Sequence, residues 1–159
     1  MTQTSSPAST ADTKANTDTL NRFIGYRMKR AYMVVLDDLM KTLDRMGLRV
    51  TTFSALSVIV ENPDITQTQL AHALRVERSG VVVIIDDLEL SGLVTRGRVD
   101  GDRRAYALRA TPKGEAKQKE ASEAVSAHED RVFSKLTPQD RTTLSTLLTT
   151  IERTGSLET

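Results

Sequence analysis

The sequence predicts a mainly α-helical protein that carries one small β-hairpin. From Leu20 onward, apolar residues recur every three or four positions, which is the period of helices that bury one face. The period changes once, after Gly92, where two short apolar runs flank Asp100-Gly101, a dipeptide typical of a hairpin turn. Aromatic residues make up only 4% of the 159 residues and Trp is absent, so we expect an aliphatic core.

The first predicted element is a long amphipathic helix that begins near Leu20 and ends at Gly47. It follows a stretch of Ser, Thr and Ala, residues 1–17, which has almost nothing to bury and is expected to be a disordered tail. The apolar stripe of the helix is wider than one packing surface requires, because Phe23 and Met40 extend it. A helix that is apolar on two sides usually contacts two bodies, here its own domain and a partner subunit.

Cap and turn signals predict the later elements. A helix capped by Thr51 or Thr52 runs to about Val60 and is followed by a break at Asn62-Pro63-Asp64. Two helices come next, one over 67–74 capped by Thr66 and one over about 79–91 stopped by Gly92. Two strands over 93–95 and 105–108 precede a helix opened by Thr111-Pro112 and a last helix opened by Thr137-Pro138. The stretch 115–130 is mostly charged and small, so we expect it to be exposed or a connector.

The two short helices after Thr66 have the spacing of a helix-turn-helix, whose second helix can enter the major groove of DNA. Ala71 is small where two such helices must cross, but Arg75 stands at the turn, where this motif often has Gly. A plain helical hairpin is the alternative reading of this pattern.

Five Arg, at positions 96, 98, 103, 104 and 109, surround the predicted hairpin turn and are opposed there only by Asp100 and Asp102. Guanidinium groups on a protruding hairpin can reach phosphate or a narrow minor groove. A solvated charged hairpin is the alternative for this segment alone. Together, the two features predict a winged helix-turn-helix.

The composition excludes several classes of function. The chain has no Cys, so disulfides, thiol redox switches and thiolate metal sites are excluded. It has only two His, so a structural or catalytic transition-metal site is not expected either. We expect no cofactor, no transmembrane segment, no signal peptide and a cytoplasmic protein. An enzyme is not expected, because there is no Gly-rich phosphate loop; a small hydrolase, the alternative, would need His72 or His128 as its base.

The order of these elements resembles the MarR (multiple-antibiotic-resistance regulator) family over roughly Leu20 to Ile151. The most specific matches are Gly92-Leu93-Val94, Asp102-Arg103-Arg104, Leu108, Thr111 and Gly114. The resemblance implies an obligate homodimer that binds a palindromic double-stranded DNA operator, usually represses, and is released by a small molecule. It divides the chain into the tail 1–17, a dimerisation helix 18–48, a winged helix-turn-helix lobe 49–114, C-terminal dimerisation helices 115–153 and a tail 154–159.

The resemblance also implies the DNA-binding residues. Asp102 and Arg104 match the wing positions at which Arg contacts the minor groove or phosphate and Asp orients that Arg; a turn-forming Asp is compatible with this role. Further expected contacts are Arg75, Arg78, Ser79, Gly80, Val82, Val83, Arg96, Arg98 and Arg103. Val82 and Val83 would touch thymine methyl groups if they point outward, and the alternative is that both are partly core.

In the family, the effector pocket lies where the dimerisation helices meet the DNA-binding lobe. Candidate residues on the first helix are Phe23, Tyr26, Arg27, Arg30 and Tyr32. The segments around them resemble the branch that controls hydroxycinnamate catabolism, which implies an aromatic acid or aromatic acyl-CoA as ligand. The alternatives are a solvated helix face for the Arg residues and ordinary packing for the Tyr residues. A winged-helix module that binds protein and not DNA is the remaining alternative function.

Overall fold

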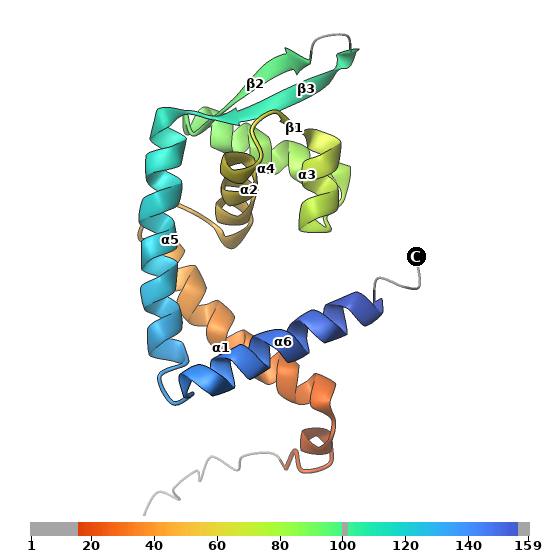
Figure 1. The fold of residues 1–159 in the computed structure, drawn as a ribbon, viewed down its shortest axis with the longest axis vertical. Helices are drawn as coiled ribbons and strands as arrows, with labels where there is room; N and C mark the ends of the chain where they lie inside the picture. The colour runs from red at the N-terminus through yellow and green to blue at the C-terminus, as the bar shows by residue number, and fades with distance from the viewer. Residues whose placement is uncertain (1–15, 100–101, 156–159) are drawn as a thin grey trace, which may run out of the picture. The chain divides into compact units, whose positions relative to one another are not determined.

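The computed structural model describes residues 16–99 and 102–155 (Figure 1). The elements in chain order are η1 (Leu20–Arg22), α1 (Ile24–Asp44), α2 (Val50–Glu61), β1 (Ile65–Thr66), α3 (Gln67–Leu74), α4 (Arg78–Leu90), β2 (Val94–Val99), β3 (Asp102–Ala110), α5 (Pro112–Val132) and α6 (Pro138–Gly155). The mainly helical class is therefore confirmed. The chain divides into two compact units at a boundary within α1, between Val34 and Val35.

The first helix is shorter than predicted at both ends. Leu20–Arg22 form a 3-10 turn, and Phe23 is extended, with φ −90° and ψ 125°, before α1 begins at Ile24. At the other end α1 stops at Asp44, and Gly47 adopts a φ of +69°, which glycine accommodates without a Cβ clash. Most of the predicted tail, residues 1–15, lies outside the described residues.

Helix α2 begins two or three residues earlier than expected, with Arg49 as its N-cap. Thr52 lies at the third helical position, and its hydroxyl accepts a hydrogen bond from the Arg49 N–H at 2.9 Å. The prediction of Thr51 or Thr52 as the cap was thus wrong. The predicted break is confirmed, because Asn62 is the C-cap.

The predictions for α3 and α4 are confirmed to within one residue. Thr66 caps α3: its hydroxyl accepts from the Gln69 N–H at 3.2 Å, and the Gln69 side chain accepts from the Thr66 N–H at 2.9 Å. Helix α4 ends at Leu90, and Gly92 follows with a φ of +69°.

The sheet has three antiparallel strands, in the order β1-β3-β2, where two were predicted. The added strand, β1, pairs Ile65 with Leu108. The hairpin strands are also longer than predicted and form a two-stranded wing (Figure 1). The predicted turn at Asp100-Gly101 lies outside the described residues.

Helix α5 is continuous through the stretch that was expected to be exposed or a connector. Thr111 caps it by accepting from the Gly114 N–H at 3.0 Å, and Pro112 occupies its first turn. Ala121 and His128 of this stretch are buried, so α5 is a packed helix along part of its length.

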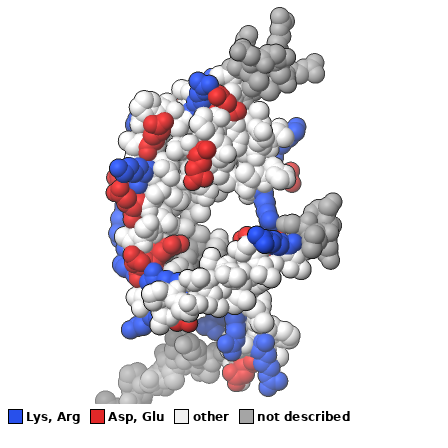
Figure 2. All heavy atoms as spheres, in the orientation of Figure 1, with Lys and Arg blue, Asp and Glu red and all other residues white. Residues whose placement is uncertain are grey.

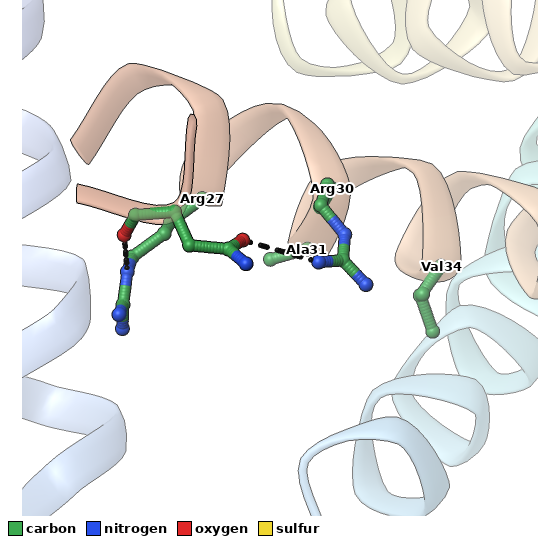
Figure 3. Close-up of a pocket in the computed structure, with 5 residues that line it drawn as sticks. Arg27, Arg30, Ala31 and Val34 are labelled. Atoms are coloured by element: carbon green, nitrogen blue, oxygen red, sulfur yellow. Dashed lines mark hydrogen bonds between the residues drawn. The ribbon is translucent and has the colours of Figure 1, made fainter. Parts of the chain in front are cut away.

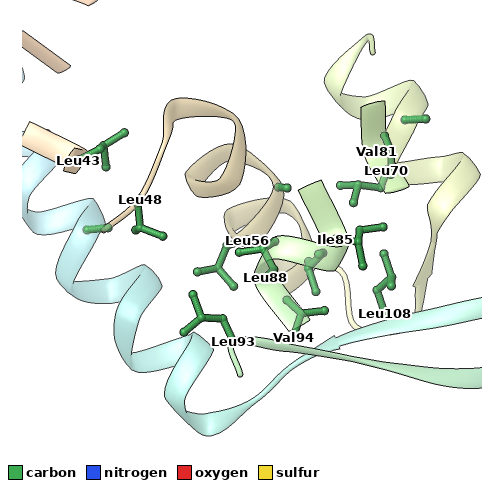
Figure 4. Packing of buried hydrophobic residues seen from close by; sticks show 14 residues of the cluster. Leu43, Leu48, Leu56, Leu70, Val81, Ile85, Leu88, Leu93, Val94 and Leu108 are labelled. Carbon is green, nitrogen blue, oxygen red and sulfur yellow. The ribbon is translucent and has the colours of Figure 1, made fainter. Parts of the chain in front are cut away.

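The core lies mostly inside the winged helix-turn-helix, extends to Leu43 of α1 and Ala121 of α5, and is aliphatic, as predicted (Figure 4). Leu56 and Ile59 of α2 are fully buried there with Ile85 of α4 and Leu108 of β3. Because these side chains come from different elements, their burial fixes α4 and the wing strands on one scaffold.

Candidate nucleic-acid interface and effector pocket

Helix α4 buries one face and exposes the other. Val81, Ile85 and Leu88 are buried, whereas the side chains of Val82 and Val83 are 41% and 64% exposed. The outward reading of both valines is therefore correct, and the core reading is wrong. Contact of the two valines with thymine methyl groups stays a prediction.

The first turn of α4 is also open to solvent. Arg78, Ser79 and Gly80 are exposed, and apart from the chain neighbours and the adjoining backbone of α4 no atom lies within 4 Å of the position that a Cβ of Gly80 would occupy. A close approach by another molecule is therefore unobstructed at this backbone. Contact of these residues with DNA stays a prediction.

The turn between the two helices is made by Arg75. It is exposed and adopts the left-handed conformation, with φ 52° and ψ 43°, as the C-cap of α3. Glycine is common at such turns because it adopts the left-handed conformation without strain. Arg75 adopts the same conformation at a small cost in free energy.

The wing arginines separate into two groups. Arg98 lies on β2, and Arg103 and Arg104 lie with Asp102 on β3; their side chains fall outside what the structure describes. Their roles as DNA contacts, and the orienting role of Asp102, stay predictions.

Arg96 and Arg109, in contrast, are paired with carboxylates of their own lobe. The Arg96 Nη2 contacts Asp86 of α4, and its Nε lies 3.2 Å from Glu89. Arg109 donates from Nε and Nη2 to the two carboxylate oxygens of Asp64, at 2.5 and 2.7 Å. The cationic surplus that the hairpin alone suggested is therefore reduced, because two of its five arginines are compensated.

The acidic residues of α4 are compensated in the same way. Asp87 accepts a hydrogen bond from Nη2 of Arg49 at 2.5 Å, while Asp86 and Glu89 face Arg96. These carboxylates all lie in the C-terminal half of α4, so the N-terminal half carries no acidic side chain.

The unit that ends at Val34 contains a cavity of about 470 Å³ (Figure 3). It is lined by Asn21, Arg27, Arg30, Ala31 and Val34. Asn21 holds both arginines: its carbonyl accepts from Arg27 Nε at 2.5 Å, and its side-chain oxygen accepts from Arg30 Nη1 at 3.2 Å. Two guanidinium groups beside an apolar wall are suited to an anionic group that carries an apolar body.

The three aromatic candidates do not line this cavity. Phe23 and Tyr32 are 61% and 60% exposed, and Tyr26 is half-buried, with the Arg30 guanidinium 6.0 Å from its ring centroid. Asn21, Ala31 and Val34 are lining residues that sequence reasoning missed. The helical spacing of Arg27, Ala31 and Val34 was the signal that could have identified the last two.

Large apolar side chains are exposed on the first and last helical segments. Before Val35 these are Leu20, Phe23, Ile24, Met28, Tyr32, Met33 and Val34. On α6 they are Leu144, Leu147, Leu148 and Ile151, and the visible face of α6 carries few charges (Figure 2). Apolar residues exposed at this density are typical of protein–protein interfaces.

The two histidines have different environments. His72 is exposed on α3, whereas His128 is 1% exposed and its Nδ1 lies 2.6 Å from the Asp38 carboxylate. Hydrogen bonds from His128 and Arg131 hold the pKa of Asp38 below its usual range. Since the ring of His128 is buried in this pair, its position does not favour a role as a base for an external substrate.

No helix within the described ranges is both long and apolar enough to span a membrane.

The arrangement described above, a helix-turn-helix followed by a two-stranded wing, defines a winged helix-turn-helix regulator. A family model described as the MarR family matches residues 46–105. A transcriptional regulatory protein for the hcr operon of Thauera aromatica is 30% identical over 134 residues, which cover 84% of this chain and 81% of the relative. The chain belongs to the MarR family of transcriptional regulators.

Two solved structures carry the comparison further. The transcriptional repressor CouR bound to a 23-mer DNA duplex is 33% identical, with a TM-score of 0.83, over 88% of this chain and 99% of that one. CouR from Rhodococcus jostii bound to p-coumaroyl-CoA is 29% identical, with a TM-score of 0.75, over 85% and 95%.

Proposed function

We propose that this regulator is a homodimeric, non-enzymatic repressor that acts in the cytoplasm and leaves a palindromic operator when an aromatic acid or its CoA thioester binds. The lobe 49–114 would bind DNA, and the segments 18–48 and 115–153 would form the dimer. The observation that carries the proposal is the exposed N-terminal half of α4, which presents Val82 and Val83 beside an open first turn.

Kinship with CouR supports the DNA-binding part of the proposal, because one CouR structure contains a DNA duplex. A dimer would place two α4 helices in successive major grooves, about 34–36 Å apart. Arg98, Arg103 and Arg104 would supply wing contacts to phosphate or the minor groove, and Asp102 would orient Arg104.

The exposed apolar residues of α1 and α6 support the dimer. Their exposure in a single chain leaves a large apolar area in water, which association with a second copy would bury.

The cavity lined by Arg27 and Arg30 supports an anionic effector, and p-coumaroyl-CoA is the ligand of one CouR structure. An effector of this kind must bind the DNA-incompetent state more tightly than the competent one. A change of a few ångströms in the spacing of the two α4 helices would prevent simultaneous docking of both half-sites.

A mobility-shift titration with DNA from the region upstream of the gene tests the proposal. We expect binding at 50 mM salt that weakens by about 10³–10⁵ at 200 mM, as for about 6–10 phosphate contacts. Addition of p-coumaroyl-CoA should release the DNA, with free CoA as the control. Absence of binding at low salt would favour the alternative, a winged-helix module that binds another protein.

A further inference from the structure

Arg96 joins the wing to the recognition helix through three contacts. Its backbone N–H donates to Oε1 of Glu89 at 3.1 Å, its Nε lies 3.2 Å from Oε2 of the same carboxylate, and its Nη2 contacts Asp86. The Arg96 Nε itself makes no hydrogen bond, so Glu89 accepts from the backbone N–H and Asp86 accepts from Nη2 of the side chain. One residue of β2 is thus held to α4 at two separate points, its backbone and the end of its side chain, and two such points restrain direction as well as distance.

The charges in this cluster do not suit a phosphate contact. One guanidinium faces two carboxylates, which leaves a net charge of −1. The Arg96 side chain is also only 24% exposed, so little of it is open to a phosphate.

We propose that Arg96 is a positioning residue that sets the angle of the wing against α4, and that it does not contact DNA. This inference rests on the proposed function, because wing and recognition helix must reach the duplex together. Asp86 and Glu89 act with Arg96: they hold the strand, and their own charges are partly compensated near the phosphates that α4 approaches.

The salt dependence of operator binding separates positioning from phosphate contact. The affinity falls as salt rises, and we call the magnitude of the slope of log K against log salt the salt slope; loss of one phosphate contact lowers this magnitude by about 0.9. We expect Arg96→Gln to weaken binding about tenfold at every salt concentration with the slope unchanged. Arg98→Gln, on the same strand two residues later, is the matched comparison and should lower the slope. A lowered slope for Arg96→Gln would overturn the proposal.

The direction in which a second substitution changes the DNA affinity gives an independent test. If Arg96 contacted phosphate, Glu89→Ala would free its charge and strengthen binding. We expect Glu89→Ala to weaken binding, with little further loss in the double variant with Arg96→Gln. Asp87→Ala removes the same charge from the same helix without touching Arg96 and should not weaken binding. Stronger binding by Glu89→Ala would contradict positioning.

Hydrogen–deuterium exchange tests the same inference without DNA. Both Arg96→Gln and Glu89→Ala should speed exchange in β2 and β3 while α2 keeps its protection, which also shows that the variants fold. Unchanged exchange in the wing would overturn the proposal. If the wild-type protein binds no DNA, the proposed function fails, and this measurement still decides the role of Arg96.

Discussion

Asp64 and Arg109 form a two-point contact between residues that are 45 positions apart: the Arg109 Nε and Nη2 donate to the two carboxylate oxygens at 2.5 and 2.7 Å. The N–H of Asp64 also donates to the Leu108 carbonyl at 3.1 Å. The connection after α2 is thereby tied to the base of the wing. The guanidinium holds the pKa of Asp64 below its usual range.

The Asp64–Arg109 pair should make stability depend on pH in a defined direction. Because the folded-state pKa is lowered, the pair stabilises the fold above the ordinary Asp pKa of about 4, and this contribution is lost as pH falls through the lowered value. Asp64→Asn should lower Tm slightly at pH 7, and the difference should shrink in acid. Asp44→Asn, at the end of α1, is the control. A difference that is constant with pH would contradict the prediction.

Val83 should read thymine methyl groups. Replacing one contacted dT by deoxyuridine removes a methyl group worth about 0.8 kcal/mol when buried, or roughly a fourfold loss in affinity. We expect this loss with the wild-type protein and not with Val83→Ala. Fluorescence anisotropy with single-site substituted duplexes measures it. An equal loss of affinity for the wild type and for Val83→Ala would show that another residue contacts the methyl group.

Arg104 should contact the DNA backbone or minor groove from the wing. Arg104→Ala should weaken operator binding and lower the salt slope by about 0.9. Lys135→Ala removes the same charge at an exposed position between α5 and α6 and serves as the control. No loss of affinity for Arg104→Ala would refute the wing assignment.

Leu147 of α6 should lie in the dimer interface. Its side chain is 57% exposed in the single chain, so Leu147→Glu adds a charge that only a dimer would bury. Light scattering after gel filtration should report the 17.5 kDa protomer for this variant and twice that mass for the wild type. Thr146→Glu, one residue away on α6, should remain dimeric.

Arg30 should bind the anionic part of the effector. Arg30→Gln should weaken binding of p-coumaroyl-CoA about tenfold or more in calorimetry, because a charge-assisted hydrogen bond is lost. Arg22→Gln, a nearby cation that does not line the cavity, is the matched control. Equal affinities of the two variants would place the ligand outside this cavity.

Elements with a local signal could be predicted from the sequence. Thr66 and Gln69 are three residues apart and cap α3 through reciprocal hydrogen bonds, so the boundary is encoded locally. The two-residue strand β1 could not be predicted, because Ile65 and Thr66 form a strand only by pairing with β3, some 40 positions away.

The same distinction applies to the candidate site. The sequence predicted the basic wing. However, Arg109 pairs with Asp64, which is remote in the chain, and Arg96 of β2 pairs with Glu89 of the preceding helix α4. Such pairs arise from tertiary packing, so a local count of charges overstated the cationic surface. The outward direction of Val82 and Val83 also required the packing of α4 to be known.

Gly114 has a consequence for how α5 is joined to the base of the wing. A Cβ there would lie 2.0 Å from the Leu93 carbonyl oxygen, so the backbone of α5 rests directly on the residue that precedes β2. The Thr111 hydroxyl also donates to the Gly92 carbonyl at 2.8 Å, and Lys113 Nζ donates to that of Ser91 at 2.8 Å. Any side chain larger than the hydrogen of Gly114 would force α5 away from Leu93 and strain these two hydrogen bonds, so the register of α5 against the base of the wing depends on this one glycine.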